Sequence, residues 1–131
     1  KAKKANVSVL FDRAMSCCLP YPAEHFDRVV SSLFFHHLPW LEKEQTAKEL
    51  YRVLKPGAQL HVADWGRASN KLMRGLFLFE QMFDGFDKTQ DNVSGKLVTL
   101  FEQSGFIEVT QKQTFDTLFG TLALYSSTKP G

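Results

Sequence analysis

The stretch ELYRVLKPGAQLHVADWG, from Glu49 to Gly66, limits most strongly what this chain can fold into. An amphipathic helix is predicted over 41–54, with apolar residues on one face and charges on the other. Lys55-Pro56-Gly57 ends that helix, because proline cannot continue the helical hydrogen-bond ladder. The residues at 58–64 then predict a strand. The stretch therefore predicts one helix-to-strand unit of an alternating α/β chain.

The rest of the chain continues this alternation. A nearly continuous apolar run that starts at Phe26 favours a buried central strand, and prolines in the preceding LPYP predict an extended loop. A helix that starts at a capping Asp or Asn and stops at Gly105 is predicted over 91–106. The other predicted elements are a strand at 5–11, a helix at 70–86 and an antiparallel strand pair at 107–114 and 121–127. Alternating units of this kind imply an α/β fold with a parallel sheet and helices on its faces.

Composition excludes several classes of function. The chain has 131 residues, which fits one domain, and its 12 Phe and 44% hydrophobic residues suffice for a packed core. A net charge of +2, with its basic residues scattered, does not support nucleic-acid binding. No apolar run reaches the ~18 residues of a membrane helix, so we expect no membrane partner. Cys17 and Cys18 are adjacent and rarely bridge each other, which favours free thiols in a reducing, cytoplasmic compartment.

Polar and aromatic residues follow two of the predicted strands. Ser31 and Ser32 lie near the carboxyl end of the strand predicted over 26–35, and Asp64 and Trp65 lie at the end of the strand at 58–64. Ligands of open α/β sheets bind outside the carboxyl ends of the strands. We therefore expect these residues to share one rim of the sheet, together with Leu33–His37.

Three blocks of the sequence resemble class I S-adenosylmethionine-dependent methyltransferases of the type 11 and type 12 small-molecule branch. These blocks are LPYPAEHFDRVVSSLFFHHLP, ELYRVLKPGAQLHVADWG and LFEQSGFIEV, and the resemblance covers Ala5–Tyr125. It implies a Rossmann-like sheet with strand order three-two-one-four-five-seven-six and an antiparallel seventh strand. Matched to this order, 5–11 is the third strand, 26–32 the fourth and 58–64 the fifth. The last two segments become the sixth and seventh strands.

The chain also departs from the family pattern. The Gly-rich first loop and the acidic residue that ends the second strand have no match, and KAKKANVSVL resembles the stretch just after them. The resemblance therefore implies that residues 1–131 form a single partial methyltransferase domain, an incomplete sheet without the first two strands and with a hairpin at the carboxyl end. A larger parent enzyme would then transfer a methyl group from S-adenosylmethionine to a small molecule.

The resemblance also assigns site residues. Those on the cofactor side are Met15, Ser16, Ser31, Ser32, Leu33 and His37, and those on the substrate side are Asp64, Trp65, Phe79 and Phe83. Met15 stands where the family has an adenine-binding Asp. His37 matches the commoner family position and is a candidate base, although no catalytic residue is otherwise identified. Asp64 has an alternative role as a helix cap, and the Phe residues have one as core. No metal site is expected, because adjacent histidines seldom ligate one ion.

Two other functions remain open. Without the first two strands, the strand at 26–32 becomes an exposed hydrophobic edge, and such edges seek pairing. A non-catalytic assembly module that forms a homodimer, or that is completed by another chain, is therefore the alternative to an enzyme. A dinucleotide-dependent oxidoreductase is a third function, but it would need the same absent glycine loop.

Overall fold

The computed structural model of the chain describes residues 8–66, 95–118 and 120–131. Its strands are β1 (Phe26–Ser32), β2 (Leu54–Trp65), β3 (Ile107–Thr117) and β4 (Gly120–Thr128). Its helices are the short 3-10 turn η1 (Phe35–His37), α1 (Trp40–Val53) and α4 (Lys96–Gln103).

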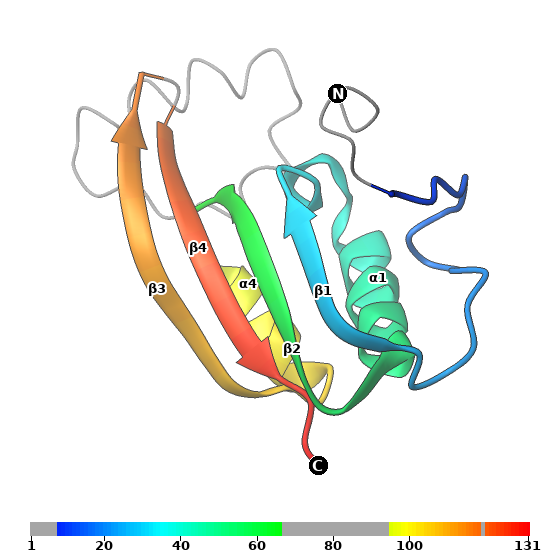
Figure 1. Cartoon of the computed structure of the whole chain (residues 1–131). Helices are drawn as coiled ribbons and strands as arrows, with labels where there is room; N and C mark the ends of the chain where they lie inside the picture. Colours follow the sequence, from blue (N-terminus) through cyan, green and yellow to red (C-terminus); the bar gives the residue numbers. More distant parts are fainter. Residues whose placement is uncertain (1–7, 67–94, 119) are drawn as a thin grey trace.

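The strands form one sheet in the order β1-β2-β4-β3 (Figure 1). β1 and β2 are parallel, whereas β4 runs antiparallel to both of its neighbours, β2 and β3. This arrangement corresponds to the fourth, fifth, seventh and sixth strands of the order that the methyltransferase resemblance implies. The predicted α/β class and the carboxyl-terminal antiparallel hairpin are therefore confirmed.

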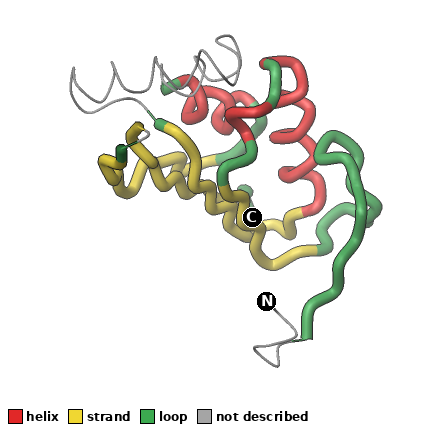
Figure 2. The backbone as a smooth tube through the Cα atoms, turned by 90° about the horizontal axis from the view of Figure 1, so that it is seen from above, coloured by secondary structure: helices red, strands yellow, loops and turns green. Residues whose placement is uncertain are grey.

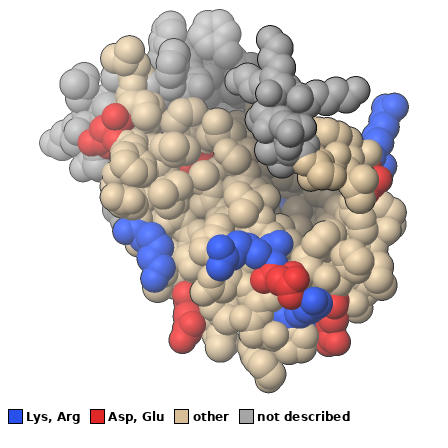
Figure 3. All heavy atoms as spheres, in the orientation of Figure 1, with Lys and Arg blue, Asp and Glu red and all other residues tan. Residues whose placement is uncertain are grey.

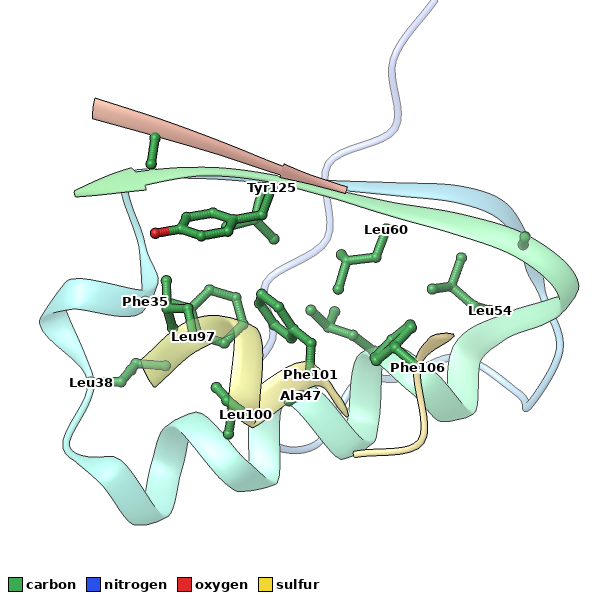
Figure 4. Packing of buried hydrophobic residues seen from close by; sticks show 14 residues of the cluster. Phe35, Leu38, Ala47, Leu54, Leu60, Leu97, Leu100, Phe101, Phe106 and Tyr125 are labelled. Atoms are coloured by element: carbon green, nitrogen blue, oxygen red, sulfur yellow. The ribbon is translucent and has the colours of Figure 1, made fainter. Parts of the chain in front are cut away.

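Both described α-helices cover the same face of the sheet, as the view along its edge shows (Figure 2). Alternate residues of β2 and β4 point to this face and are buried, among them Leu60, Val62 and Ala123. They pack against Leu100 and Phe101 of α4 in one hydrophobic core (Figure 4). The core thus holds the strand ends at fixed positions beneath the candidate site.

The other face of the sheet is not covered by a described helix and is the face seen in Figure 3. On β1, Val30 is 70% exposed there. Charged side chains gather toward the amino ends of β1 and β2, and the middle of this face is largely uncharged (Figure 3). The two faces of the sheet therefore differ sharply in burial.

The end of α4 confirms the predicted stop at Gly105. Gly105 has a φ of 103°, and its N–H donates to the carbonyl of Glu102 at 3.0 Å. The N–H of Phe106 donates to the carbonyl of Phe101 at 3.1 Å, which completes a Schellman motif. A Cβ at position 105 would lie 3.1 Å from the ring of Tyr51, so both the backbone angle and the close approach favour glycine.

Two sequence predictions about strands are wrong. The strand at 5–11 is absent over its described part, since residues 8–11 form no strand and Leu10 and Phe11 are 91% and 81% exposed. An extended segment becomes a strand only when another backbone pairs with it, and no described strand does so. The buried central position that the apolar run favoured for β1 is also wrong: among the described strands β1 pairs with β2 alone, so it is the edge strand expected of a sheet without its first two strands.

Other predictions lie partly or wholly outside the described residues. The helix predicted at 70–86 falls there. The helix predicted at 91–106 begins later, at Lys96, and its N-cap is Gly95 without a side-chain hydrogen bond, so the predicted capping Asp or Asn is wrong. Among the residues that the structure describes, no helix is both long enough and apolar enough to cross a lipid bilayer.

Candidate functional site

The carboxyl ends of β1 and β2 lie side by side, with Ser32 opposite Ala63 in the parallel register. The N–H of Leu33 donates to the carbonyl of Ala63 at 2.7 Å, and this bond ties the turn after β1 to β2. Leu33 has a φ of 50°, a left-handed conformation that is uncommon for a residue with a side chain. Such backbone strain clusters at functional sites, so this rim is the leading candidate.

Asp64 is fully buried at the end of β2 and organises this rim. Its Oδ2 accepts the backbone N–H groups of Phe34 at 3.1 Å and Phe35 at 2.7 Å. Its Oδ1 accepts the N–H of Trp65 at 2.8 Å and lies 2.7 Å from Nδ1 of His36. Asp64 therefore binds the backbone at the start of η1, the turn that follows β1, and both of its oxygens accept hydrogen bonds from protein groups. The helix that it was predicted to cap, the next one in sequence, lies outside the described residues.

The two adjacent histidines differ in their surroundings. His36 is 5% exposed and bound to Asp64, whereas His37 is exposed and its backbone N–H donates to the carbonyl of Phe34 at 3.1 Å. Their ring centroids are 3.9 Å apart, and the half-buried ring of Trp65 lies 6.3 Å from that of His36. Sequence reasoning chose His37 as the candidate base, and that choice stays a prediction. The difference in burial between the two histidines could not be predicted from the sequence, because it arises from the contact of His36 with the buried carboxylate.

Tyr125 of β4 is a further residue that sequence reasoning missed. It is 2% exposed, and its hydroxyl is buried without a partner among the described residues. Burial and the charge of Asp64 raise the pKa of Tyr125 to about 12, so the hydroxyl keeps its proton. Figure 4 shows this hydroxyl pointing toward the carboxyl end of β2, and a Cβ at Gly66 would lie 3.2 Å from it. A hydrogen-bond donor is therefore held beneath the rim.

The predicted cofactor residues fall into two places. Ser31, Ser32 and Leu33 end β1 at the rim, and Leu33 is 44% exposed. Met15 and Ser16 belong to a turn on the flank of α1, where the hydroxyl of Ser16 lies 2.8 Å from that of Thr46. The contacts of Ser16 are thus with α1 rather than with the rim.

The remaining predicted residues are Phe79 and Phe83, which lie outside the described residues. Within the described ranges, no group of three His, Cys, Asp or Glu side chains could hold a metal ion. The rim can therefore offer small hydroxyls, a buried carboxylate bound to histidine and a neutral phenol.

Comparisons with known proteins identify methyltransferases as similar in sequence. A family model described as a methyltransferase domain matches residues 1–62. The ubiquinone/menaquinone biosynthesis C-methyltransferase UbiE of Pseudomonas savastanoi is 33% identical over 92 residues, which cover 70% of this chain and 33% of that protein. The chain thus spans about a third of the length of this curated relative.

Solved structures share the fold. A methyltransferase of Thermotoga maritima superimposes with a TM-score of 0.70 at 24% identity, over 98% of this chain and 67% of that one. The phosphoethanolamine N-methyltransferase 2 of Haemonchus contortus, solved with phosphomonomethylethanolamine and S-adenosylhomocysteine, gives 0.63 at 14% identity, over 88% and 36%. In sequence the chain is similar to methyltransferases of the type 11 branch, and in fold it is similar to S-adenosylmethionine-dependent methyltransferases.

Proposed function

We propose that this chain forms part of an enzyme that transfers a methyl group from S-adenosylmethionine to a small molecule. The observation that carries the proposal is the rim at the carboxyl ends of β1 and β2, where open α/β sheets bind their ligands. Leu33 in a left-handed conformation and the buried Asp64 fix the backbone of this rim. Methyl transfer depends mainly on alignment of the reacting atoms, which a fixed rim of this kind provides.

The chemistry of the rim fits one side of the methyl donor. Ser31 and Ser32 are small, and Ser32 is exposed, so we propose that the donor lies against these residues and Leu33. Met15 and Ser16 stay candidates for the adenine contact. When bound, S-adenosylmethionine supplies an electrophilic methyl group, and its sulfur keeps the electron pair of the bond that breaks. We propose that the Gly-rich loop and the ribose-binding acid come from a further segment of the protein or from a partner chain.

A reduced quinone is the methyl acceptor that we propose. The curated relative is named as a C-methyltransferase of ubiquinone and menaquinone biosynthesis. A reduced quinone carries aromatic hydroxyls, and loss of a hydroxyl proton makes the neighbouring ring carbon nucleophilic. We propose that Asp64 and Trp65 form the acceptor side of the rim, with Asp64 acting through the groups it binds. Phe79 and Phe83 remain predicted substrate contacts.

Donor binding and methyl transfer test this function separately. Calorimetry on the protein in the full length that its gene encodes should show S-adenosylmethionine binding, and this chain alone should bind far more weakly. Labelled methyl groups should then appear in naphthohydroquinone but not in phosphoethanolamine, which is the control acceptor. Failure of the full-length protein to bind the donor would contradict the enzyme function. Label in phosphoethanolamine alone would contradict only the acceptor class.

The edge position of β1 favours a second function, assembly with another chain. β1 leaves one side of its backbone unpaired among the described strands, and Val30 is 70% exposed beside it. We propose that this edge pairs with a second copy or with a completing chain. Val30→Lys should weaken self-association in sedimentation experiments, and Thr99→Lys, at an exposed position on α4, is the matched control. A wild-type chain that stays monomeric at high concentration would contradict assembly.

We also propose a cytoplasmic location. Cys17 and Cys18 are free thiols in the structure, which fits a reducing compartment. Fractionation of cells that produce the full-length protein checks this location.

A further inference from the structure

Granted the methyl transfer proposed for this chain, we propose that His36 is its general base and that Asp64 is the positioning residue that sets the tautomer of His36. The feature that leads to this inference is a buried carboxylate bound to one nitrogen of an imidazole at the strand-end rim. General bases of enzymes are commonly oriented by a third group in this way.

The surroundings of Asp64 decide which group donates the hydrogen bond to the other. Three backbone N–H groups, those of Phe34, Phe35 and Trp65, already point at its two oxygens. Hydrogen bonds of this kind stabilise the ionised carboxylate. An ionised carboxylate can only accept, so Nδ1 of His36 carries the hydrogen and donates it to Oδ1 across 2.7 Å.

This tautomer leaves a lone pair on Nε2, the nitrogen that can take a proton. No described residue supplies a bond to Nε2. The side chain of His36 is not completely sealed, because 5% of the residue stays exposed. We propose that a substrate reaches Nε2 through this exposed part.

Methylation of a ring carbon requires a group that takes up a proton, and we propose that Nε2 of His36 is that group. The hydroxyl O–H bond of a reduced quinone breaks, and its proton goes to Nε2 while the freed electron pair moves to the ring carbon. That carbon forms the new bond to the methyl group as the bond between the methyl group and the donor sulfur breaks, and the electron pair of that bond stays on sulfur. The carbon then loses its own hydrogen as a proton, which restores the aromatic ring, and the oxygen regains a proton from the imidazolium. One proton is released overall. The imidazolium that forms is stabilised by the charge of Asp64.

His37 lacks these features. It is exposed, and no described carboxylate binds its ring. The titratable groups that face His36 are Asp64 from β2 and His37 from η1, and Tyr125 from β4 lies close enough to Asp64 to feel its charge. Asp64 is the nearest of these groups that favours the protonated imidazole.

Nuclear magnetic resonance of the ring nitrogens tests the positioning role without donor or acceptor. Wild-type His36 should show a protonated Nδ1 and an unprotonated Nε2 at neutral pH. Asp64→Asn should move the hydrogen to Nε2, because an amide that faces Nδ1 with its NH₂ group donates instead of accepting. A wild-type spectrum with the hydrogen on Nε2 would overturn the inference.

Kinetics of the full-length protein with naphthohydroquinone test the base. His36→Gln should lower kcat by about 100-fold with little change in KM, and the loss of rate at acid pH should disappear. Asp64→Asn should lower kcat in the same direction. His25→Gln is the matched control, because His25 is exposed near the amino end of β1, and its kcat should be unchanged.

Two contrary results separate the possible failures. A His36→Gln variant that binds S-adenosylmethionine and keeps the wild-type kcat, or a loss confined to His37→Gln, would overturn the base alone. A wild-type protein that does not bind the donor in calorimetry would overturn the proposed function and the base with it.

Discussion

At opposite ends of β1 and β2, the molecule holds two acid–base contacts of nearly equal length. Near the amino ends, Nζ of Lys55 donates to Asp27 at 2.8 Å, and the two side chains are 46% and 86% exposed. At the carboxyl ends, His36 and Asp64 meet at 2.7 Å and are 6% and 0% exposed. Water screens the first pair, so its contribution to stability is small. Removing one partner of the second pair leaves buried polar groups without a hydrogen-bond partner, which is costly in free energy.

The largest expected effect comes from removing the buried acid. Asp64→Ala leaves three backbone N–H groups and Nδ1 of His36 without their acceptor. We expect the free energy of unfolding to fall by about 3–5 kcal/mol, measured by urea unfolding. Asp64→Asn, which keeps one accepting oxygen, should lose less. Equal urea midpoints for Asp64→Ala and Asp27→Ala would show that the buried contact and the exposed contact contribute equally to stability.

Alkaline pH should weaken the buried end through Tyr125. Its pKa is about 12 in the folded chain and 10.0 ordinarily, so folding favours the protonated phenol. This contribution is complete below a pH of about 10 and is lost as the pH rises through about 12, up to about 3 kcal/mol. Urea unfolding of wild type and Tyr125→Phe across this range measures the difference. Parallel pH curves for the two proteins would contradict the prediction.

A smaller loss of stability is expected from a substitution at Gly66, the residue directly after β2. A Cβ at Gly66 would lie 2.5 Å from Cβ of Ala123 on the neighbouring strand. Gly66→Ala should therefore push β2 and β4 apart and destabilise the chain by about 1–3 kcal/mol, measured by urea unfolding. Gly131→Ala, where a Cβ meets nothing within 4 Å, serves as the control. A Gly66→Ala variant as stable as this control would show that the strand ends can relax.

The smallest effect belongs to the exposed pair. A hydrogen bond from Lys55 and its charge lower the pKa of Asp27, so the contribution of this pair is present at neutral pH and is lost as the pH falls. Because both side chains are solvated, Asp27→Asn should leave the urea midpoint at neutral pH unchanged within error. The same midpoint should not respond to added salt. A clear shift in either measurement would show that the amino end matters more than its exposure indicates.

Sequence reasoning succeeded where local signals decide the structure. The start of β1 at Phe26 follows from an apolar run after a proline loop, and the stop of α4 follows from Gly105. It could not predict contacts between distant parts of the chain. The hydrogen bond between His36 and Asp64 joins residues 28 positions apart in sequence, and no local signal predicts it. The burial of the Tyr125 hydroxyl likewise depends on how β4 sits against β2.

The same sheet order has a consequence for how the chain folds. β3 and β4 are joined by a short turn and can pair early, whereas Trp65 of β2 must find Leu122 of β4 across most of the remaining sequence. Closing such a long loop costs entropy before any contact offsets it, so we expect this pairing to limit the folding rate. Tyr125 and Asp64 come close together only when β2 has paired with β4. An intermediate that holds the hairpin alone would therefore carry a formed strand pair and no site.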